Sequence, residues 1–181
     1  MPREKIEATP DTPPLSMGPL PLFARTGIGY DSHSFAPGHE MVLGGVTIPA
    51  TVMLVGHSDG DAVVHAIIDA LLGAAAAGDI GEMFPDSDEE NRGRESLGML
   101  KLAIDRVHAY GYAVFQLDVT VIAETPALAP HRRAIRETLS DALGVPIGHV
   151  SIKAKTNERM GWIGRGEGLA CIAVATVVPL P

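Results

Sequence analysis

Three residues of this sequence, Asp31, His33 and His65, have the types and spacing of a metal site. Asp31 and His33 are two residues apart in a segment predicted to be extended, so their side chains project from the same face and can chelate together. His65 lies in a predicted helix one turn from both Asp61 and Asp69, where either carboxylate could accept its second ring proton. An Asp, His, His set suits zinc and leaves a fourth tetrahedral position for a substrate. Because an Asp-x-His pair is also common as surface polar structure, the residues alone leave both interpretations open.

Two further segments could bind phosphate. His57-Ser58-Asp59-Gly60-Asp61 precedes the predicted helix, whose free N–H groups form a natural anion site. The alternative is simple capping of the helix by Ser58, and the two acids there would repel a phosphate. Gly164-Arg165-Gly166-Glu167-Gly168 combines approachable backbone with an arginine donor, although glycine-rich turns with a solvated arginine are common. The absence of a Walker A motif, of G-x-G-x-x-G before a helix and of H-E-x-x-H disfavours ATP-driven, nucleotide-redox and zincin chemistry.

A mixture of strands and helices must position these side chains. Alternating or continuous apolar residues predict strands over residues 24–35, 115–121, 150–154 and 169–178, with a hairpin around 41–49. Helical periodicity predicts helices over 59–77, with Ser58 as N-cap and Gly78 as stop, from 97 to about 111, and from about 128 to 143. The mixture predicts an α/β (α+β) fold, a single-domain sandwich of a mixed sheet covered by helices. The apolar segment 169–178 could be buried on both faces in an oligomer, or could equally be a core strand of a monomer.

Composition narrows the class of protein. The 181 residues fit one domain, and no segment reaches the roughly 18 consecutive apolar residues of a membrane span. Fourteen Lys and Arg against 22 Asp and Glu give a formal net charge of −8 without a basic run, which argues against a nucleic-acid partner. The single cysteine, Cys171, excludes an intrachain disulfide and is predicted to be a packed thiol. Residues 1–23 are Pro-rich without an apolar leader, so we expect a disordered or extension tail, a domain over 24–181 and a cytoplasmic location.

Taken together, the motifs resemble one enzyme family. Gly29-Tyr30-Asp31-Ser32-His33, the segment 57–61 with His65, Gly78-Asp79-Ile80-Gly81, Phe84-Pro85-Asp86-Ser87-Asp88 and the segment 164–168 closely resemble the 2-C-methyl-D-erythritol 2,4-cyclodiphosphate synthases. The likeness runs from about Arg25 to Val178. It is specific because all of these motifs occur in the same order as in the family, although each motif alone is not specific. It implies conversion of 4-diphosphocytidyl-2-C-methyl-D-erythritol 2-phosphate into the cyclic diphosphate with release of CMP. This is a phosphorus-oxygen lyase reaction of the non-mevalonate isoprenoid pathway.

The resemblance also implies roles for individual residues. Asp31, His33 and His65 resemble the zinc ligands, and Glu158 resembles the ligand of a second divalent ion, Mg²⁺ or Mn²⁺. His57 and Thr156 match the positions that stabilise the transition state. The residues implied to bind substrate are Asp31, Ser32, His33, His57, Ser58, Asp79, Ile80, Gly81, Phe84, Pro85, Asp86, Ser87, Asp88, Ala123, Glu124, Thr125, Pro126, Ala127, Leu128, Ala129, Lys155, Thr156, Asn157, Glu158, Trp162 and Arg165.

Three regions of that set correspond to known parts of the family's site, and two positions differ from the family form. Residues 79–88 correspond to the methylerythritol-binding loop, residues 123–129 and 155–158 to the cytidine pocket, and Arg165 to a phosphate-binding arginine. The departures are Lys155-Thr156-Asn157-Glu158, where the family form has Thr-Thr-Thr-Glu, and Trp162, where it has Phe.

The implied partner is a cytidine diphosphate small molecule, with neither nucleic acid nor membrane, and the implied assembly is a homotrimer with active sites between subunits. In the implied mechanism the 2-phosphate attacks the β-phosphate with metal assistance. Two other functions stay open. One is a zinc-dependent phosphoesterase that activates water, supported by the acids Asp59, Asp61 and Asp79. The other is a non-catalytic oligomeric protein whose glycine-rich turn holds a phosphorylated ligand.

Overall fold

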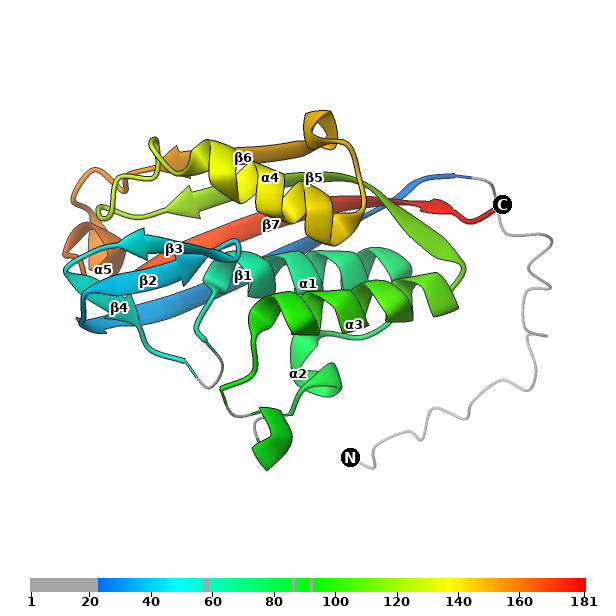
Figure 1. Ribbon diagram of the computed structural model, residues 1–181, viewed down its shortest axis with the longest axis horizontal. Helices are drawn as coiled ribbons and strands as arrows, with labels where there is room; N and C mark the ends of the chain where they lie inside the picture. Colours follow the sequence, from blue (N-terminus) through cyan, green and yellow to red (C-terminus); the bar gives the residue numbers. More distant parts are fainter. Residues whose placement is uncertain (1–22, 57–58, 86, 92) are drawn as a thin grey trace, which may run out of the picture.

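Five strands form one mixed sheet in the computed structural model, which describes residues 23–56, 59–85, 87–91 and 93–181 (Figure 1). In spatial order the strands are β4 (Val52–Leu54), β1 (Arg25–Pro37), β7 (Gly168–Pro179), β5 (Tyr112–Ile122) and β6 (Val150–Lys155). β5 and β6 pair in parallel, and the other neighbouring strands of the sheet are antiparallel. β2 (Glu40–Leu43) and β3 (Val46–Pro49) form the predicted hairpin beside the sheet. The predicted fold class, a mixed sheet covered by helices, is confirmed.

The three predicted helices are present. α1 (Ala62–Ala75) is shorter than predicted at both ends, α3 (Ser96–Ala109) starts one residue earlier and ends about two residues earlier than predicted, and α4 (Arg132–Leu143) ends where predicted. Asp61 caps α1 by accepting the N–H groups of Val63 and Val64, and the helix ends at Ala76 in a left-handed conformation. The prediction that Gly78 stops the helix is therefore wrong by two residues, and Ser58 lies outside the described residues. α4 starts about four residues later than predicted, because Pro130 disfavours helical geometry at the residue before it.

Sequence reasoning missed five short elements. They are β4, α2 (Ile80–Met83), α5 (Gly161–Gly164) and two 3₁₀ turns, η1 (Glu89–Asn91) and η2 (Ile147–His149). Each is at most four residues long, too short to show a periodic pattern. The predicted tail over residues 1–23 lies outside the described residues, apart from Phe23, whose side chain is exposed.

One face of the sheet is buried and the other is open. A buried row crosses four strands through the paired residues Gly29, Ala173, Val119 and Ile152. α1, α3 and α4 pack against this face (Figure 1). The adjacent row points to the opposite face and consists of Ile28, Val174, Asp118 and Ser151. Ile28 is 70% exposed and Val174 is 36% exposed, so β7 is buried on one face of this chain rather than on both.

Two glycines let β1 lie directly against α1. A Cβ atom at Gly27 would collide with the backbone of Ala70 and Ala74, and one at Gly29 with the backbone of Ala66. Any side chain at either position would push the strand away from the helix. Because residues two apart in a strand point the same way, Asp31 and His33 also face α1.

Helix α1 is buried except along one narrow stripe. Most of its residues, from Ala62 to Ala75, are apolar and inaccessible to solvent, whereas His65 and Asp69 are partly exposed and Gly73 is exposed. These three residues are four positions apart and share one side of the helix. Among the described residues, no helix is long and apolar enough to cross a membrane. Cys171 is buried in the sheet, and burial raises the pKa of its thiol well above the ordinary value, as expected of a packed thiol.

Candidate active site

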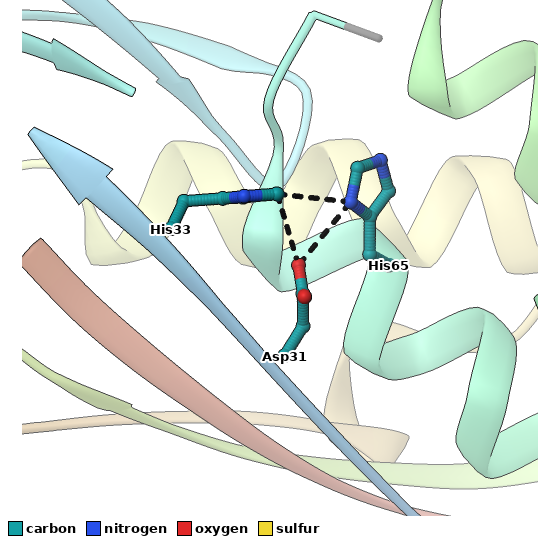
Figure 2. A group of neighbouring side chains, drawn as sticks. All are labelled: Asp31, His33 and His65. Atoms are coloured by element: carbon teal, nitrogen blue, oxygen red, sulfur yellow. Dashed lines mark hydrogen bonds and ion pairs between the residues drawn. The ribbon is translucent and has the colours of Figure 1, made fainter. Parts of the chain in front are cut away.

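Asp31 and His33 from β1 and His65 from α1 turn their polar atoms toward one another (Figure 2). His33 Nε2 lies 3.1 Å from Asp31 Oδ2, His65 Nδ1 lies 3.2 Å from the same oxygen, and the two nitrogens are 3.2 Å apart. The three atoms form a nearly equilateral triangle. A tetrahedral zinc ion with bonds of about 2.0 to 2.1 Å has ligand atoms roughly 3.3 Å apart. The triangle therefore fits one face of a zinc tetrahedron, and the structure brings together the three residues predicted to chelate one ion.

The Asp31 carboxylate is electrostatically prepared for a cation. Burial raises the pKa of this carboxyl group, but hydrogen bonds and charge interactions with His33 and His65 lower it by more. The net pKa lies well below the ordinary value for an aspartate. Metal ligands must be deprotonated, so this group is in the binding form at neutral pH.

The second ring nitrogen of His65 has a different partner from the one predicted. Its Nε2 lies 3.1 Å from the hydroxyl oxygen of Ser96, the first residue of α3. The predicted partners bind backbone groups instead: Asp61 accepts N–H groups at the start of α1, and Asp69 accepts the N–H of Ile80 at 2.8 Å. The expectation of a carboxylate at four-residue spacing is therefore wrong. The first N–H groups of a helix have no acceptor within their own helix, and here they donate to these carboxylates.

The acids that could have served a water-activating hydrolase also accept backbone N–H groups. Asp59 accepts from Ser96 at 3.0 Å, Asp61 accepts from Gly44 at 2.9 Å and Gly45 at 2.7 Å, and Asp79 accepts from Glu82 at 2.8 Å. Asp61 is fully buried. These carboxylates stabilise the backbone, so their presence in the sequence is weaker support for a phosphoesterase that activates water.

A second group of predicted residues meets at the ends of β5 and β6. The N–H of Ala123 donates to the carbonyl of Lys155 at 2.9 Å. Glu124 Oε1 accepts the N–H groups of Asn157 at 3.0 Å and of Arg159 at 3.1 Å. The structure thus brings together the two segments predicted to form the cytidine pocket, residues 123–129 and 155–158.

The turn after β6 has an unusual backbone. Glu158 and Arg159 both have positive φ, 52° and 60°, although neither is glycine. The Glu124 carboxylate bridges this turn, and the hydroxyl of Thr156 donates to Glu158 Oε1 at 2.9 Å. Sequence reasoning included Glu124 as a member of the pocket, but its function as an anchor depends on contacts between β5 and β6 that no local pattern reveals.

The two groups lie on separate strands of the sheet, since β1 is two strands from β5 and three strands from β6. The strand register aligns Asp31 with Cys171, Cys171 with Val121 and Val121 with Ala154. Neighbouring strands are about 4.8 Å apart, so at this level β1 is separated by about 10 Å from β5 and by about 14 Å from β6. In the described part of the chain, the metal-ligand triangle and the predicted cytidine segments therefore lie on strands that are not neighbours.

The remaining predicted residues are distributed around these two groups. His57, Ser58 and Asp86 lie outside the described residues. Asp79, Ile80 and Gly81 begin α2, which Asp69 attaches to α1. Phe84 is buried with the Arg94 guanidinium 5.5 Å from its ring centre, whereas Pro85, Ser87 and Asp88 are exposed. Ser32 is exposed on the open face of the sheet, since alternate strand residues point to opposite sides.

The glycine-rich segment near the C-terminus has a packing explanation. A Cβ atom at Gly164 would collide with the backbone of Arg159, and one at Gly168 with the backbone carbonyl of His33. Arg165 is exposed and pairs with Glu167 at 2.6 Å, and Trp162 is partly exposed on α5. In the single chain, this segment is therefore a glycine-rich turn with a solvated arginine, which was the alternative to a phosphate site.

A cleft of about 850 Å³ reaches Asp59, which bonds to Ser96 behind His65. Its described lining residues are Pro37, Gly38, His39, Glu40, Met41, Val42, Thr51, Met53, Leu54 and Asp59. None of these is among the residues predicted to bind substrate. In the described part of this chain, the cleft and the predicted substrate residues do not coincide.

Comparison with known proteins identifies the family. The model of the YgbB family matches residues 24–178. The chain belongs to the YgbB family. One relative is the 2-C-methyl-D-erythritol 2,4-cyclodiphosphate synthase of Gemmatimonas aurantiaca. It is 53% identical to this chain over 161 residues, which cover 89% of this chain and 97% of the relative. The family resemblance stated from the motifs is confirmed.

Solved structures agree with this YgbB-family assignment. The bifunctional IspDF from Campylobacter jejuni has a TM-score of 0.84 and 36% identity over 87% of this chain, and the matched part is 43% of that longer chain. The CDP complex of IspF from Plasmodium falciparum has a TM-score of 0.77 and 32% identity, and it covers 88% of this chain and 99% of its own.

Proposed function

We propose that this chain converts 4-diphosphocytidyl-2-C-methyl-D-erythritol 2-phosphate into 2-C-methyl-D-erythritol 2,4-cyclodiphosphate and CMP, as an enzyme of the non-mevalonate isoprenoid pathway. Relatives named for this synthase activity support the proposal at 53% and 52% identity. The CDP bound to the Plasmodium falciparum relative supports a cytidine nucleotide as part of the substrate. The observation that carries the proposal is the Asp31, His33, His65 triangle, a ligand set that suits catalytic zinc, in a member of this family.

Two metal ions complete the proposal. Two imidazoles and one carboxylate favour zinc over magnesium, which prefers oxygen ligands. Bound zinc would supply Lewis-acid polarisation of a phosphate oxygen. For Mg²⁺ or Mn²⁺ the proposed ligand is Glu158, which presents a carboxylate on the turn shared with Thr156.

The residues of the chain would bind and orient the substrate. The substrate's 2-phosphate can act as the nucleophile, because its second pKa is about 6 and it is largely dianionic at neutral pH. The reaction therefore requires no protein base, in accord with the backbone hydrogen bonds of Asp59, Asp61 and Asp79. His57 and Thr156 would stabilise the charge that develops at the reacting phosphates.

The substrate's three parts would be bound by separate segments. The methylerythritol unit would be held by residues 79–88, the cytidine unit by residues 123–129 and 155–158, and the phosphates by Ser58 and Arg165. On substrate binding, the Arg165 guanidinium would leave its exposed ion pair with Glu167 and bind a phosphate instead. Water must be excluded during the reaction, because hydrolysis would otherwise compete with ring closure.

The proposed assembly is a homotrimer whose active sites lie between subunits. Two observations support it: the two site groups lie on strands about 10 to 14 Å apart in one chain, and the open sheet face carries apolar side chains. Ile28 and Tyr30 of that face are 70% and 56% exposed, and Ile172 and Val174 adjoin them in β7. Burial of such a face in an oligomer would remove it from water. The expected cytoplasmic location stays a prediction.

Product identification tests the proposed activity. The purified protein, with bound zinc and added Mg²⁺, is incubated with the cytidine diphosphate substrate, and the products are followed by ³¹P NMR. We expect CMP and a cyclic diphosphate in equal amounts, and no turnover by a matched sample stripped of metal. A linear phosphate product would identify a hydrolase. Binding of the substrate without turnover, whether or not metal is present, would identify a non-catalytic binding protein.

A further inference from the structure

Ser96 lies directly behind the proposed zinc ligand His65. It is the first residue of α3, it is fully buried, and its Oγ is 3.1 Å from His65 Nε2. The other ring nitrogen of His65, Nδ1, faces Asp31 and His33. The imidazole therefore spans the distance between the metal-ligand triangle and a buried hydroxyl group.

Asp59 holds Ser96 from the opposite side. Its Oδ2 accepts the backbone N–H of Ser96 at 3.0 Å, and its Oδ1 accepts a short hydrogen bond from the Ser96 hydroxyl. Asp59 Oδ1 is itself 3.3 Å from the N–H of Asp61, next to the start of α1. The resulting chain of contacts runs from the triangle through His65 and Ser96 to Asp59.

Asp59 sets the direction of the hydrogen bonds through Ser96. An ionised carboxylate only accepts hydrogen bonds, so the hydroxyl hydrogen of Ser96 points to Asp59. Ser96 Oγ then offers a lone pair to His65, which favours a ring proton on Nε2 and leaves the lone pair of Nδ1 for a metal ion held with Asp31 and His33. Without metal, Asp31 Oδ2 at 3.2 Å from Nδ1 competes for the ring proton.

We propose that Ser96 and Asp59 are positioning residues that fix the Nε2–H tautomer and the ring orientation of His65, and thereby strengthen zinc binding. Metal-bound histidines generally donate their other ring N–H to a fixed acceptor, and loss of that acceptor weakens metal binding. Here a buried serine held by a carboxylate takes the place of the Asp61 or Asp69 carboxylate expected from helical spacing. The inference rests on the proposed zinc site, and not on the identity of the substrate.

Ser96 also has a structural role, which the test must separate from this one. Glu95, the residue before α3, makes no side-chain capping bond, so the Asp59 bond to the Ser96 N–H serves as a cap from outside the helix. Ser96→Ala removes the hydroxyl and keeps that backbone bond. Ser140→Ala is a matched control, because Ser140 is also buried in a helix and loses one hydroxyl bond, to the carbonyl of Val145 at 2.6 Å, away from the site.

The experiment measures zinc affinity by competition with a chelator of known affinity, on full-length protein without substrate. We expect zinc affinity to fall about 10- to 100-fold in Ser96→Ala, and to stay within twofold of wild type in Ser140→Ala. Circular dichroism checks the fold of both variants. If Ser96→Ala does not fold, Asp59→Asn provides the same test, since its amide offers one acceptor oxygen to two Ser96 donors and should also weaken zinc binding.

The tautomer is measured separately, by ¹⁵N NMR of the histidine rings in metal-free protein. The Nε2–H form of His65 should be more populated in wild type than in Ser96→Ala, where Ser96 no longer competes with Asp31 for the ring proton. Zinc affinity within twofold of wild type in Ser96→Ala would overturn the proposal, and so would weakened affinity with an unchanged tautomer. Because neither measurement uses substrate, a wrong assignment of the reaction would leave both results interpretable.

Discussion

The Nδ1 atom of His65 and the Oδ2 atom of Asp31 lie 3.2 Å apart, although the two residues are 34 positions apart in the sequence. One belongs to a helix and the other to a strand, and glycines at positions 27 and 29 permit the close approach of these elements. His33 completes the triangle from the same strand. The proposed zinc site therefore depends on the packing of β1 on α1.

Removing His65 should remove the metal. In His65→Ala the ion would keep two of its three protein ligands, so we expect less than a tenth of the wild-type zinc content and no detectable turnover. Metal analysis by mass spectrometry after gel filtration measures the zinc, and circular dichroism checks the fold. His108→Ala, which alters an exposed histidine at the end of α3, should keep its zinc. Roughly stoichiometric zinc in His65→Ala would rule out the ligand assignment.

Changing Glu158 should separate the two metals. Glu158→Gln removes the charge that would hold Mg²⁺ or Mn²⁺ but leaves the triangle intact, so zinc content should match wild type while most of the magnesium-dependent rate is lost. The measurement is the rate as a function of Mg²⁺ concentration. Glu137→Gln, which breaks an exposed pair with Arg133 on α4, is the control. A wild-type magnesium profile in Glu158→Gln would contradict the assignment.

Glu124 should matter through the turn that it holds. Glu124→Ala removes the acceptor for the N–H groups of Asn157 and Arg159, which have a left-handed residue between them. Leaving such N–H groups without an acceptor costs about 1 to 3 kcal/mol. Because these groups are partly solvated, we expect a loss of transition-state stabilisation at the lower end of this range, which corresponds to a fall of about tenfold in kcat/KM. Zinc content should not change. Glu124→Gln keeps an oxygen acceptor and should recover most of the activity, and equal losses in both variants would show that the charge matters rather than the acceptor.

Two inactive variants should complement each other if active sites form between subunits. Asp31→Ala disables the metal half and Thr156→Ala the nucleotide half. In randomly mixed trimers from equal amounts of both, about a quarter of the sites would pair two intact halves, so activity should approach about a quarter of wild type. The variants are co-refolded, and native mass spectrometry verifies mixing. Mixed trimers without any recovered activity would mean that each chain completes its own site.

The parts of the site that could be predicted from the sequence are those set by local periodicity. Asp31 and His33 share a face because strand residues alternate, and the apolar pattern around His65 identifies α1 without knowledge of its neighbours. Ser96 could not be found in this way, because its contact with His65 exists only where α3 packs beside α1. The same limit applies to Asp61, whose bonds to Gly44 and Gly45 come from the β2–β3 turn, 16 to 17 residues earlier.

The open face of the sheet shows a related limit. The apolar residues of β7 predict burial, but they do not say which side is covered. Ile28, Val174 and Asp118 become one row only when three strands are paired in register. A sequence pattern has period two along a strand, whereas the face of a sheet is defined across strands that are distant in the chain.

Isotope labelling with water tests the central claim most directly. The reaction is run in ¹⁸O-enriched water and the products are analysed by mass spectrometry. Attack by the substrate's own 2-phosphate transfers no oxygen from water, so we expect both the CMP and the cyclic diphosphate to be free of label. Labelled CMP, or a labelled linear phosphate as the main product, would show that water is the nucleophile and would contradict the proposed cyclisation.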